Sequence, residues 1–451
     1  MIKQPKALYL LNFVSMWECF SYYGMRVLLV LFMTQKLGFS DMQAFALYAL
    51  YTTLVELGGI IGGTIADRFL GLKRAINIGG WTIALGHLCL ALPGEESSLY
   101  LGLGLIIAGT SFFRSNVAAF IGDFYEEKDP RRDVGYTIYY TGINIGGFLA
   151  TVATGIVAEI YGWHAGFSLA GIGMVAGNIA LTMGKKLLLN PTREQKLPGF
   201  TATTVSSIGL LAVGVVAAVV LSHSHMVLPW MPLVAVGFII YILTKLKLRE
   251  FKKLFFFVAC MVVFYACEEQ LGSSLVLFAE RHVQRETLFG VIPSASLVMF
   301  NPLTILLAGS LLSRKCPFSQ LGKVQGSFLL LGAAFCLLYA SCLFTGDGCL
   351  VPVAYAIAAT ILISLGEILI GPTVYAVASE SATRSLNGLV MSVVTFGYSL
   401  ANLCSGYVSQ LMATTEEGDI AVYANGFGLV GAAVLLIGLA FQLRHRIKIY
   451  G

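Results

Sequence analysis

The chain has 451 residues, of which 57% are apolar and only 12% are charged, and its formal net charge is +5. Soluble proteins carry about twice this share of charged residues, so the composition excludes a soluble enzyme, a disordered chain and a secreted disulfide-rich scaffold. The apolar residues form runs of about 20, the length that crosses about 30 Å of hydrocarbon, and we therefore predict an all-α polytopic membrane protein.

Fourteen segments of the chain are long and apolar enough to be predicted as transmembrane helices. The first segment, 7–34, follows Lys3 and Lys6 and contains Glu18 and Arg26. Because it also lacks a small-residue cleavage site, we interpret it as a retained helix and not as a signal peptide. The other segments are predicted at 44–65, 73–92, 99–123, 135–159, 165–187, 203–222, 226–246, 252–280, 286–313, 322–345, 349–379, 386–411 and 424–445.

The basic residues predict which side of the membrane each loop occupies. If the N-terminus is inside, 24 of the 29 Lys and Arg residues fall in inner segments and three, Lys36, Arg281 and Arg285, fall outside. This asymmetry follows the positive-inside rule. We therefore expect both termini to be cytoplasmic.

The longest inner linker, Lys185–Gly199, divides the predicted helices into groups. The two helices that follow it, 203–246, contain no charged residue at membrane depth, whereas the last six helices do. We predict an N-terminal six-helix bundle at 1–190, an inserted transmembrane hairpin with its linkers at 191–250, and a C-terminal six-helix bundle at 251–451. Two bundles with a binding site between them are the usual plan of a transporter.

Charged side chains inside a membrane cost on the order of 3 kcal/mol each and are functional candidates by default. The N-terminal bundle contains both signs of charge, whereas the C-terminal bundle contains three acids and no base at membrane depth. A proton or an amine-bearing substrate would balance this excess of acid. The acids are Glu18, Glu56, Glu268, Glu269 and Glu367, and the bases are Arg26 and Arg114.

The spacing within the first helix places three of its polar residues together. Glu18, Tyr22 and Arg26 recur every four residues, so they share one face, and this face is too polar for lipid. It would line a cavity, or it would belong to an ion pair, Glu18–Arg114 or Glu56–Arg26, that only holds helices together. The pairs Asn301-Pro302 and Glu367…Pro372 place helix breakers beside polar groups, which is typical of cavity-lining helices but also of simple kinks.

Metal and enzyme chemistry have little support in the sequence. The nine cysteines are scattered through apolar runs without a CxxC pair, and His223 and His225 alone are a weak zinc signal. No nucleophile–base pair is recognisable at membrane depth. We therefore expect no catalytic residue, no metal site and no nucleic-acid partner.

Several motifs resemble known transporters. The segment Gly63–Arg74 resembles the loop motif of the major facilitator superfamily. Phe20–Gly24, which reads FSYYG, and Asp129–Gly146, which reads DPRRDVGYTIYYTGINIG, resemble signatures of the proton-dependent oligopeptide transporter (POT) family. Glu268–Ser274, Asn301-Pro302 and Gly366–Pro372 follow in the family's order, so the resemblance covers most of the chain.

The resemblance implies a major facilitator fold and import of di- and tripeptides by alternating access, with protons as the coupling ion and no other cofactor. We also expect a monomer in a bacterial inner membrane. Arg26 and Arg114 would meet the peptide carboxylate, and Tyr22 and Tyr23 would line the pocket. The residues implied for the peptide amino terminus are Asn144, Asn301 and Glu367, and those for proton coupling or gating are Glu18, Glu56, Glu268 and Glu269.

Four departures from the family pattern bear on substrate and coupling. The family's ExxER motif reads Ser15-Met-Trp-Glu18-Cys19, and Glu56 occupies a position where members usually carry tyrosine. Arg114 replaces a usual lysine, and the usual tryptophan within 386–411 is absent. We hypothesise that Glu56 takes over part of the lost acid's role. The alternatives are another small zwitterion, an amino acid or an anion as cargo, with altered or absent proton coupling, or a non-transporting sensor.

Overall fold

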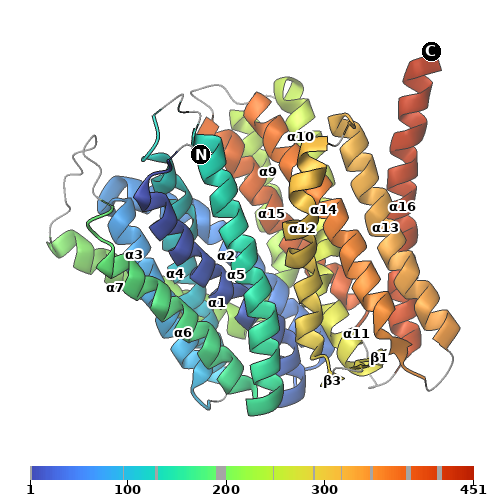
Figure 1. The fold of residues 1–451 in the computed structure, drawn as a ribbon, viewed down its shortest axis with the longest axis horizontal. Coiled ribbons are helices and arrows are strands. Elements are labelled where there is room, and N and C mark those ends of the chain that lie inside the picture. Colours follow the sequence, from blue (N-terminus) through green and yellow to red (C-terminus); the bar gives the residue numbers. More distant parts are fainter. Residues whose placement is uncertain are drawn as a thin grey trace. The chain divides into compact units, whose positions relative to one another are not determined.

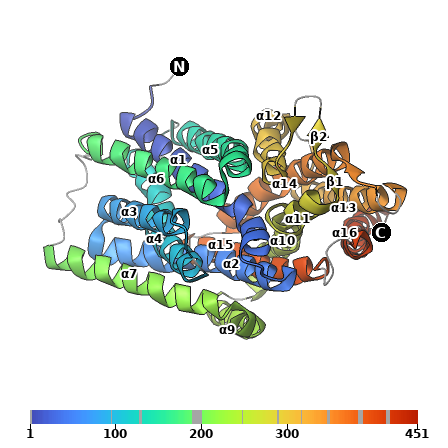
Figure 2. The same ribbon diagram turned by 90° about the horizontal axis from the view of Figure 1, so that it is seen from below.

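The computed structural model is helical throughout most of its described length (Figures 1 and 2). Within the described residues, ten helices are long and apolar enough to cross a membrane, and two shorter apolar helices accompany them. All fourteen predicted segments contain a helix, which confirms the predicted fold class. The structure describes residues 3–94, 96–126, 129, 131–188, 200–246, 248–287, 290–315, 317–345, 349–381, 387–413 and 419–450.

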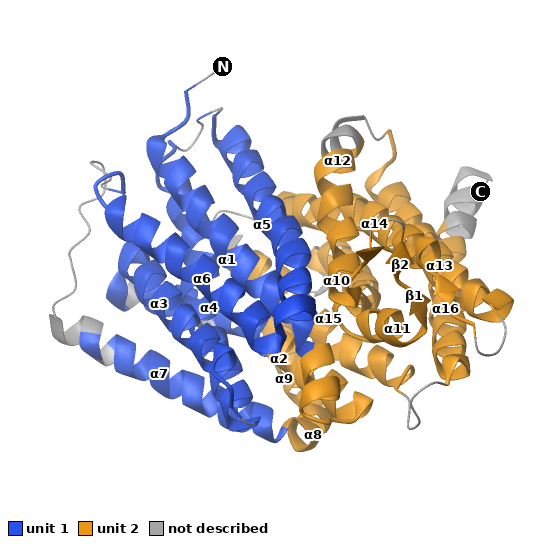
Figure 3. Ribbon diagram, turned by 60° about the horizontal axis from the view of Figure 1, so that its bottom comes forward, with its two compact units in different colours: residues 1–29, 54–223 blue, residues 30–53, 224–451 orange. Residues whose placement is uncertain are grey.

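The chain divides into two compact units (Figure 3). Unit 1 comprises residues 1–29 and 54–223, and unit 2 comprises residues 30–53 and 224–451. The division passes through α1 and α2, so the first half of α2 belongs to unit 2. The elements of unit 1 are α1 (Lys6–Leu31), α2 (Asp41–Ile65), α3 (Leu72–Ala91), α4 (Glu96–Gly122), α5 (Arg131–Tyr161), α6 (Trp163–Met183) and α7 (Phe200–Ser222), with a π-helical turn at Ala66–Leu70. The π-helical turn at Phe32–Lys36 follows α1 and belongs to unit 2.

Unit 2 contains the remaining helices and four very short strands. Strand β1 (Val283–Gln284) pairs in parallel with β4 (Val351–Pro352), and β2 (Glu286–Thr287) pairs antiparallel with β3 (Gly290–Val291). The helices are α8 (Ser224–Val227), η3 (Leu228–Trp230), α9 (Met231–Lys245), α10 (Leu248–Glu268), η4 (Glu269–Gly272), α11 (Ser274–His282), η5 (Ser294–Met299), α12 (Phe300–Lys315), α13 (Gln320–Thr345), α14 (Val353–Ser381), α15 (Asn387–Gln410) and α16 (Ile420–Tyr450).

The predicted helix at 286–313 is wrong in its first part. Its first described residues form the β2–β3 hairpin, and α12 begins only at Phe300. Gly290 has a φ of +109°, which favours glycine, and Pro293 has an extended backbone with ψ of 137°. A residue that precedes proline is disfavoured in the α region, so Pro293 prevents the helix from starting earlier.

The two helices of the predicted hairpin pack on different units. In unit 1, α7 lies along α4, where a Cβ atom on Gly104 would collide with the backbone of Gly214. In unit 2, α9 packs on α15, and the ring centroids of Phe238 and Phe396 are 4.4 Å apart. The boundaries of the compact units therefore differ from those of the predicted domains. The inserted hairpin at 191–250 stays a prediction.

Glycine pairs bring α3 and α4 into close contact. A Cβ atom on Gly79 would lie 2.6 Å from the carbonyl oxygen of Gly109, and the reverse distance is also 2.6 Å. One heptad further along α3, Gly86 meets Gly102 in the same way, with the Cβ of Gly86 2.7 Å from the carbonyl oxygen of Gly102. Only glycine fits at such separations, because real Cβ atoms essentially never approach other heavy atoms within 3.0 Å.

Replacing Gly79 with alanine is therefore expected to destabilise the protein by about 1–3 kcal/mol, the usual cost of overpacking a close contact. Gly59→Ala is the matched control, since no atom lies within 4 Å of the position that its Cβ atom would take and alanine favours a helix over glycine. Thermal unfolding of the two purified variants in detergent would check this. Equal melting temperatures would contradict the proposed close packing of α3 on α4.

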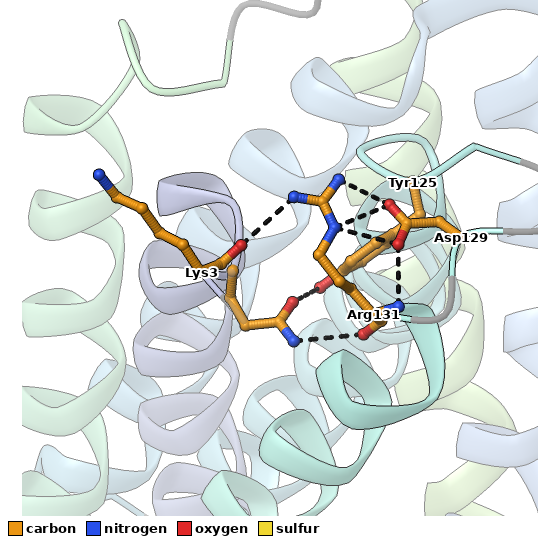
Figure 4. A network of polar contacts seen from close by, with 5 residues as sticks. Lys3, Tyr125, Asp129 and Arg131 are labelled. Carbon is orange, nitrogen blue, oxygen red and sulfur yellow. Dashed lines mark hydrogen bonds and ion pairs between the residues drawn. The ribbon is translucent and has the colours of Figure 1, made fainter. Parts of the chain in front are cut away.

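A polar network at the start of α5 explains part of the signature at 129–146 (Figure 4). Arg131 donates to the Asp129 carboxylate at 2.7 Å and to the backbone oxygen of Lys3 at 3.3 Å. Tyr125 donates to Gln4 at 2.8 Å, and Gln4 donates to the backbone oxygen of Arg131. The hydrogen bonds from Arg131 hold the pKa of Asp129 below its usual value. The network ties the N-terminal segment to the turn between α4 and α5.

Candidate functional site

An arginine paired with two acids forms the centre of a polar cluster in unit 1. The Nη2 atom of Arg114 on α4 lies 3.0 Å from Glu18 on α1, and its Nη1 atom lies 3.6 Å from Glu56 on α2. The guanidinium also lies over the ring of Tyr22, 4.4 Å from its centroid. Three helices therefore contribute to one site of compensated charge, which we call the arginine cluster.

The two acids of the arginine cluster differ in their surroundings. The Glu18 side chain is 3% exposed, and its second carboxylate oxygen accepts a hydrogen bond from the Cys19 thiol at 3.6 Å. The Glu56 side chain is 28% exposed, and that of Arg114 is 32% exposed. Glu18 is thus a buried, doubly bound partner, whereas Glu56 is accessible and lies further from the guanidinium.

The other predicted residues of α1 adjoin this cluster. The guanidinium of Arg26 lies 5.8 Å from the ring centroid of Tyr22 and 5.9 Å from that of Tyr23, and the two rings meet edge to face. Such separations are within the range of cation–π attraction. The structure therefore places Glu18, Tyr22 and Arg26 along one face of α1, as the spacing predicted.

Unit 2 contains a second cluster, around Glu367. The Asn301 amide donates to the Glu367 carboxylate at 2.9 Å, joining α12 to α14. Pro302 lies in the first turn of α12, where a proline needs no backbone donor. Pro372, in contrast, lies inside α14. We call the Asn301–Glu367 pair and the tyrosines beside it the acidic cluster.

The acidic cluster includes three tyrosines that pack on one another, of which Tyr265 and Tyr398 interact electrostatically with Glu367. The rings of Tyr265 and Tyr398 are 4.8 Å apart, and Tyr375 stacks on Tyr398 at 6.4 Å. The hydroxyl of Tyr265 lies above Gly371, 3.0 Å from the position that a Cβ atom would take. The sequence reasoning did not identify these tyrosines, because apolar helices usually contain aromatic residues and no spacing distinguished them.

Glu269 lies where helix geometry changes. The predicted helix at 252–280 is interrupted by the tighter turn η4, which starts at Glu269. The Tyr48 hydroxyl, from the first half of α2, lies 3.5 Å from the Glu269 carboxylate. Glu268 is the last residue of α10 and is partly exposed.

A buried amide fixes this turn. Gln270 donates to the backbone oxygens of Ala266 and Ser405, at 3.0 and 3.1 Å. Its carbonyl oxygen accepts hydrogen bonds from Ser274 at 2.7 Å and from Ser409 at 2.8 Å. All of its strong hydrogen-bonding positions are filled, so the network holds η4 rigidly against α15 and orients the neighbouring Glu269.

The structure divides the three residues predicted for the peptide amino terminus. Asn144 is 9% exposed and belongs to α5 of unit 1, where its amide donates to the backbone oxygen of Tyr140 at 2.9 Å. Asn301 and Glu367 belong to unit 2 and contact each other. The last two therefore form a group by direct contact within unit 2.

An ion pair that the sequence analysis missed joins the start of α2 to the end of α11. Arg281 and Asp41 form a double contact, with nitrogen–oxygen distances of 2.7 and 2.9 Å, and Tyr423 lies 3.4 Å from the same guanidinium. The sequence signal was weak, since Arg281 was one of three outer basic residues and Asp41 preceded the predicted helix. In the part of the chain that the structure describes, no three His, Cys, Asp or Glu side chains are grouped to hold a metal.

The chain is similar to known proteins over most of its length. The model of the POT family matches residues 73–425. A dipeptide and tripeptide permease A of Yersinia pestis is 29% identical over 98% of this chain and 92% of its own, and the permease of the same name from Escherichia coli strain K12 is 26% identical. A solved structure of a variant of the peptide transporter POT with alafosfalin superposes with a TM-score of 0.86 at 27% identity, covering 99% of this chain and 96% of that one. A POT family transporter in complex with 5-aminolevulinic acid gives 0.83 at 25% identity, covering 98% and 96%.

Proposed function

The chain belongs to the POT family, and on that premise we propose that it is a symporter that imports di- and tripeptides together with protons. Its relatives are named as permeases for dipeptides and tripeptides, and they align with almost the whole chain. The observation that carries the proposal is that, among the described residues, the arginines at membrane depth are all in one unit and the acid–amide pair is in the other. Unit 1 holds both membrane-embedded arginines, Arg26 and Arg114, whereas the described acid–amide pair, Asn301–Glu367, is in unit 2.

The arginine cluster suits the carboxylate end of a peptide. Arg114 is one-third exposed and presents a planar fork of donors, which matches a carboxylate better than a lysine does. Arg26 supplies a second positive charge beside the same aromatic rings, Tyr22 and Tyr23. In this proposal, the arginines bind the carboxylate and the two tyrosines line the peptide's path.

The acidic cluster suits the amino end. A primary ammonium group donates three hydrogen bonds and carries one positive charge. The Glu367 carboxylate supplies the opposite charge, and the Asn301 side chain that donates to it has a carbonyl oxygen that can accept from the ammonium. Asn144 is proposed as a further contact, although it lies in unit 1.

Proton coupling requires an acid that changes its protonation during the cycle. The candidates are Glu18 and Glu56 in unit 1 and Glu268 and Glu269 in unit 2. One proton moving inward across about 100 mV releases about 2.3 kcal/mol, enough for roughly 50-fold accumulation. A single proton per peptide therefore suffices to drive uptake, without any other cofactor.

The protein is an integral membrane protein of a transporter family and not a member of an enzyme family. We propose a monomer in a bacterial inner membrane. Both termini are proposed to lie in the cytoplasm, because 24 of 29 basic residues are then on the inner side.

A second candidate function keeps the fold and changes the cargo to another small zwitterion. The related transporter solved with 5-aminolevulinic acid, a ligand that carries an amine and a carboxylate without a peptide bond, is 25% identical to this chain. Ser15 and Cys19, which replace charged residues of the family motif, also favour an altered substrate or altered coupling.

Flux measurements in proteoliposomes test the proposal. Labelled dialanine is added with and without an inward proton gradient at matched membrane potential. We expect accumulation that collapses when the gradient is removed and that excess unlabelled dipeptide, but not free alanine, competes away. If a thermally stable protein shows no uptake of dialanine, the result points to another cargo, and stabilisation by 5-aminolevulinic acid would favour the second candidate.

A further inference from the structure

We propose that Glu56 is an internal competitor of the substrate carboxylate for Arg114, and that it takes up the coupling proton when that carboxylate binds. This inference rests on the proposed function and adds to it the residue and the step at which proton and substrate are exchanged. Its basis is that Arg114 is already bound to two carboxylates, Glu18 and Glu56, at 3.0 and 3.6 Å.

The geometry distinguishes the carboxylate that stays from the one that leaves. Glu18 is almost fully buried, makes the shorter contact and accepts a second hydrogen bond from Cys19. Glu56 makes the longer contact, to the opposite nitrogen of the guanidinium, and is 28% exposed. A peptide carboxylate that replaces Glu56 at this nitrogen leaves the contact between Glu18 and the other nitrogen in place, so Glu18 continues to hold the arginine.

Charge balance then links the displacement to a proton. Unit 1 has two negative and two positive side chains well inside its described helices, so this set is neutral when all four are ionised. A bound peptide carboxylate adds one negative charge in an environment of low dielectric constant, which is costly. Protonation of the displaced Glu56 removes one negative charge and restores neutrality. Each event is therefore more favourable when the other has occurred, as linkage requires.

The groups around Glu56 limit which residue can take the proton. Arg114 on α4 is permanently charged, and the hydroxyls and thiol nearby are neutral near pH 7. Glu18 is the other carboxylate in contact with Arg114, and its burial and its second hydrogen bond oppose release from the guanidinium. Among the described residues of unit 1, the titratable and charged groups at this site include Arg114 from α4, Glu18, Cys19, Tyr22, Tyr23 and Arg26 from α1, and Tyr139 from α5.

Binding measured against pH provides the first test. Dialanine affinity is measured by calorimetry in detergent between about pH 5.5 and about pH 7, where the peptide's own termini do not titrate. For the wild type, we expect affinity to weaken as pH rises, approaching tenfold per pH unit once Glu56 is ionised. Glu56→Gln should bind at the higher pH as tightly as the wild type binds at the lower one, with little pH dependence.

Two controls isolate the carboxylate exchange. Glu159→Gln makes the same change at an exposed position on α5 of the same unit and should keep the wild-type pH dependence. Glu56→Asp keeps an ionisable carboxylate and should keep it too, provided the variant elutes as a folded protein. Dialanine amide has no carboxylate to displace Glu56, so its affinity should not depend on whether residue 56 is Glu or Gln.

Transport measurements distinguish two outcomes: that this inference is wrong, or that the proposed function is wrong. Glu56→Gln should lose accumulation driven by the proton gradient but keep exchange of external labelled peptide for internal unlabelled peptide. A variant that keeps wild-type gradient-driven accumulation and pH-dependent binding would overturn the inference, while leaving peptide symport intact. If the wild type itself neither binds nor accumulates dialanine, the proposed function fails first.

Discussion

Replacing Arg114 with glutamine is expected to reduce dialanine uptake by at least about 30-fold. The change removes the positive charge that would bind the peptide carboxylate, and losing one member of such a desolvated charge pair commonly costs about 2–5 kcal/mol. It also leaves Glu18 and Glu56 without their shared partner. Uptake and equilibrium binding in proteoliposomes would measure the effect.

Arg114→Lys is the control for this prediction. Lysine keeps the charge but lacks the planar fork that contacts both acids, so we expect reduced uptake that remains above that of Arg114→Gln. Because the glutamine variant removes the partner that Glu18 and Glu56 share, its folding is checked by size-exclusion chromatography before uptake is interpreted. A folded Arg114→Gln protein with normal uptake would show that the carboxylate binds elsewhere.

Replacing Glu367 with glutamine is expected to weaken binding of free dipeptides by about 10- to 100-fold. The side chain keeps nearly the same shape and can still accept the hydrogen bond from Asn301, but it loses the negative charge that would attract the peptide amino terminus. Competition by unlabelled peptides against labelled dialanine would measure the change.

N-acetyl dialanine and a second variant provide the controls for Glu367. The acetylated peptide has no ammonium charge, so its weak competition should be unchanged by the substitution. Glu380→Gln alters the same residue type on the same helix, at an exposed position paired with Lys253 at 2.8 Å, and should leave dipeptide binding unaffected. An equal loss of affinity for both peptides would assign Glu367 a role other than binding the amino terminus.

The helices could be predicted from sequence because membrane-spanning segments are long and apolar. What the sequence could not reveal was where a helix changes geometry within such a segment. The turn η4 (Glu269–Gly272) follows from the hydrogen bonds of Gln270 to Ser274 and Ser409, a network that depends on tertiary neighbours. The wrong prediction of a helix over 286–299 could have been avoided in part, because Gly290 and Pro293 both disfavour a helix.

The candidate residues could be found because charge at membrane depth is rare, but their pairing could not. The spacing on α1 predicted the shared face of Glu18 and Arg26, and Glu18–Arg114 was one of the considered ion pairs. That a single guanidinium contacts both Glu18 and Glu56 depends on how α2 and α4 pack. The Asp41–Arg281 pair escaped notice because both residues lie at helix ends, where charge is common.

The signature that begins at Asp129 has a structural role that its resemblance to a family motif did not reveal. Its Gly135 leaves room for the hydroxyl of Tyr125, which a Cβ atom would displace. Tyr125 in turn holds Gln4, and Arg131 holds the backbone of Lys3. This part of the motif therefore organises the helix ends and makes no contact with the arginine cluster among the described interactions.

The sharing of Arg114 between α1 and α2 also bears on how the protein is made. Glu56 leaves the ribosome 58 residues before Arg114, which at about 5–20 residues per second is a delay of about 3–12 s. During that time, α2 carries an acid whose partner on α4 has not been synthesised, and α1 carries Glu18 in the same state. The first helices therefore cannot complete these ion pairs until α4 has been synthesised. Insertion of α4 brings Arg114 to both acids and so joins α1, α2 and α4. The ion pairs proposed to act in substrate binding therefore also contribute to the assembly of unit 1.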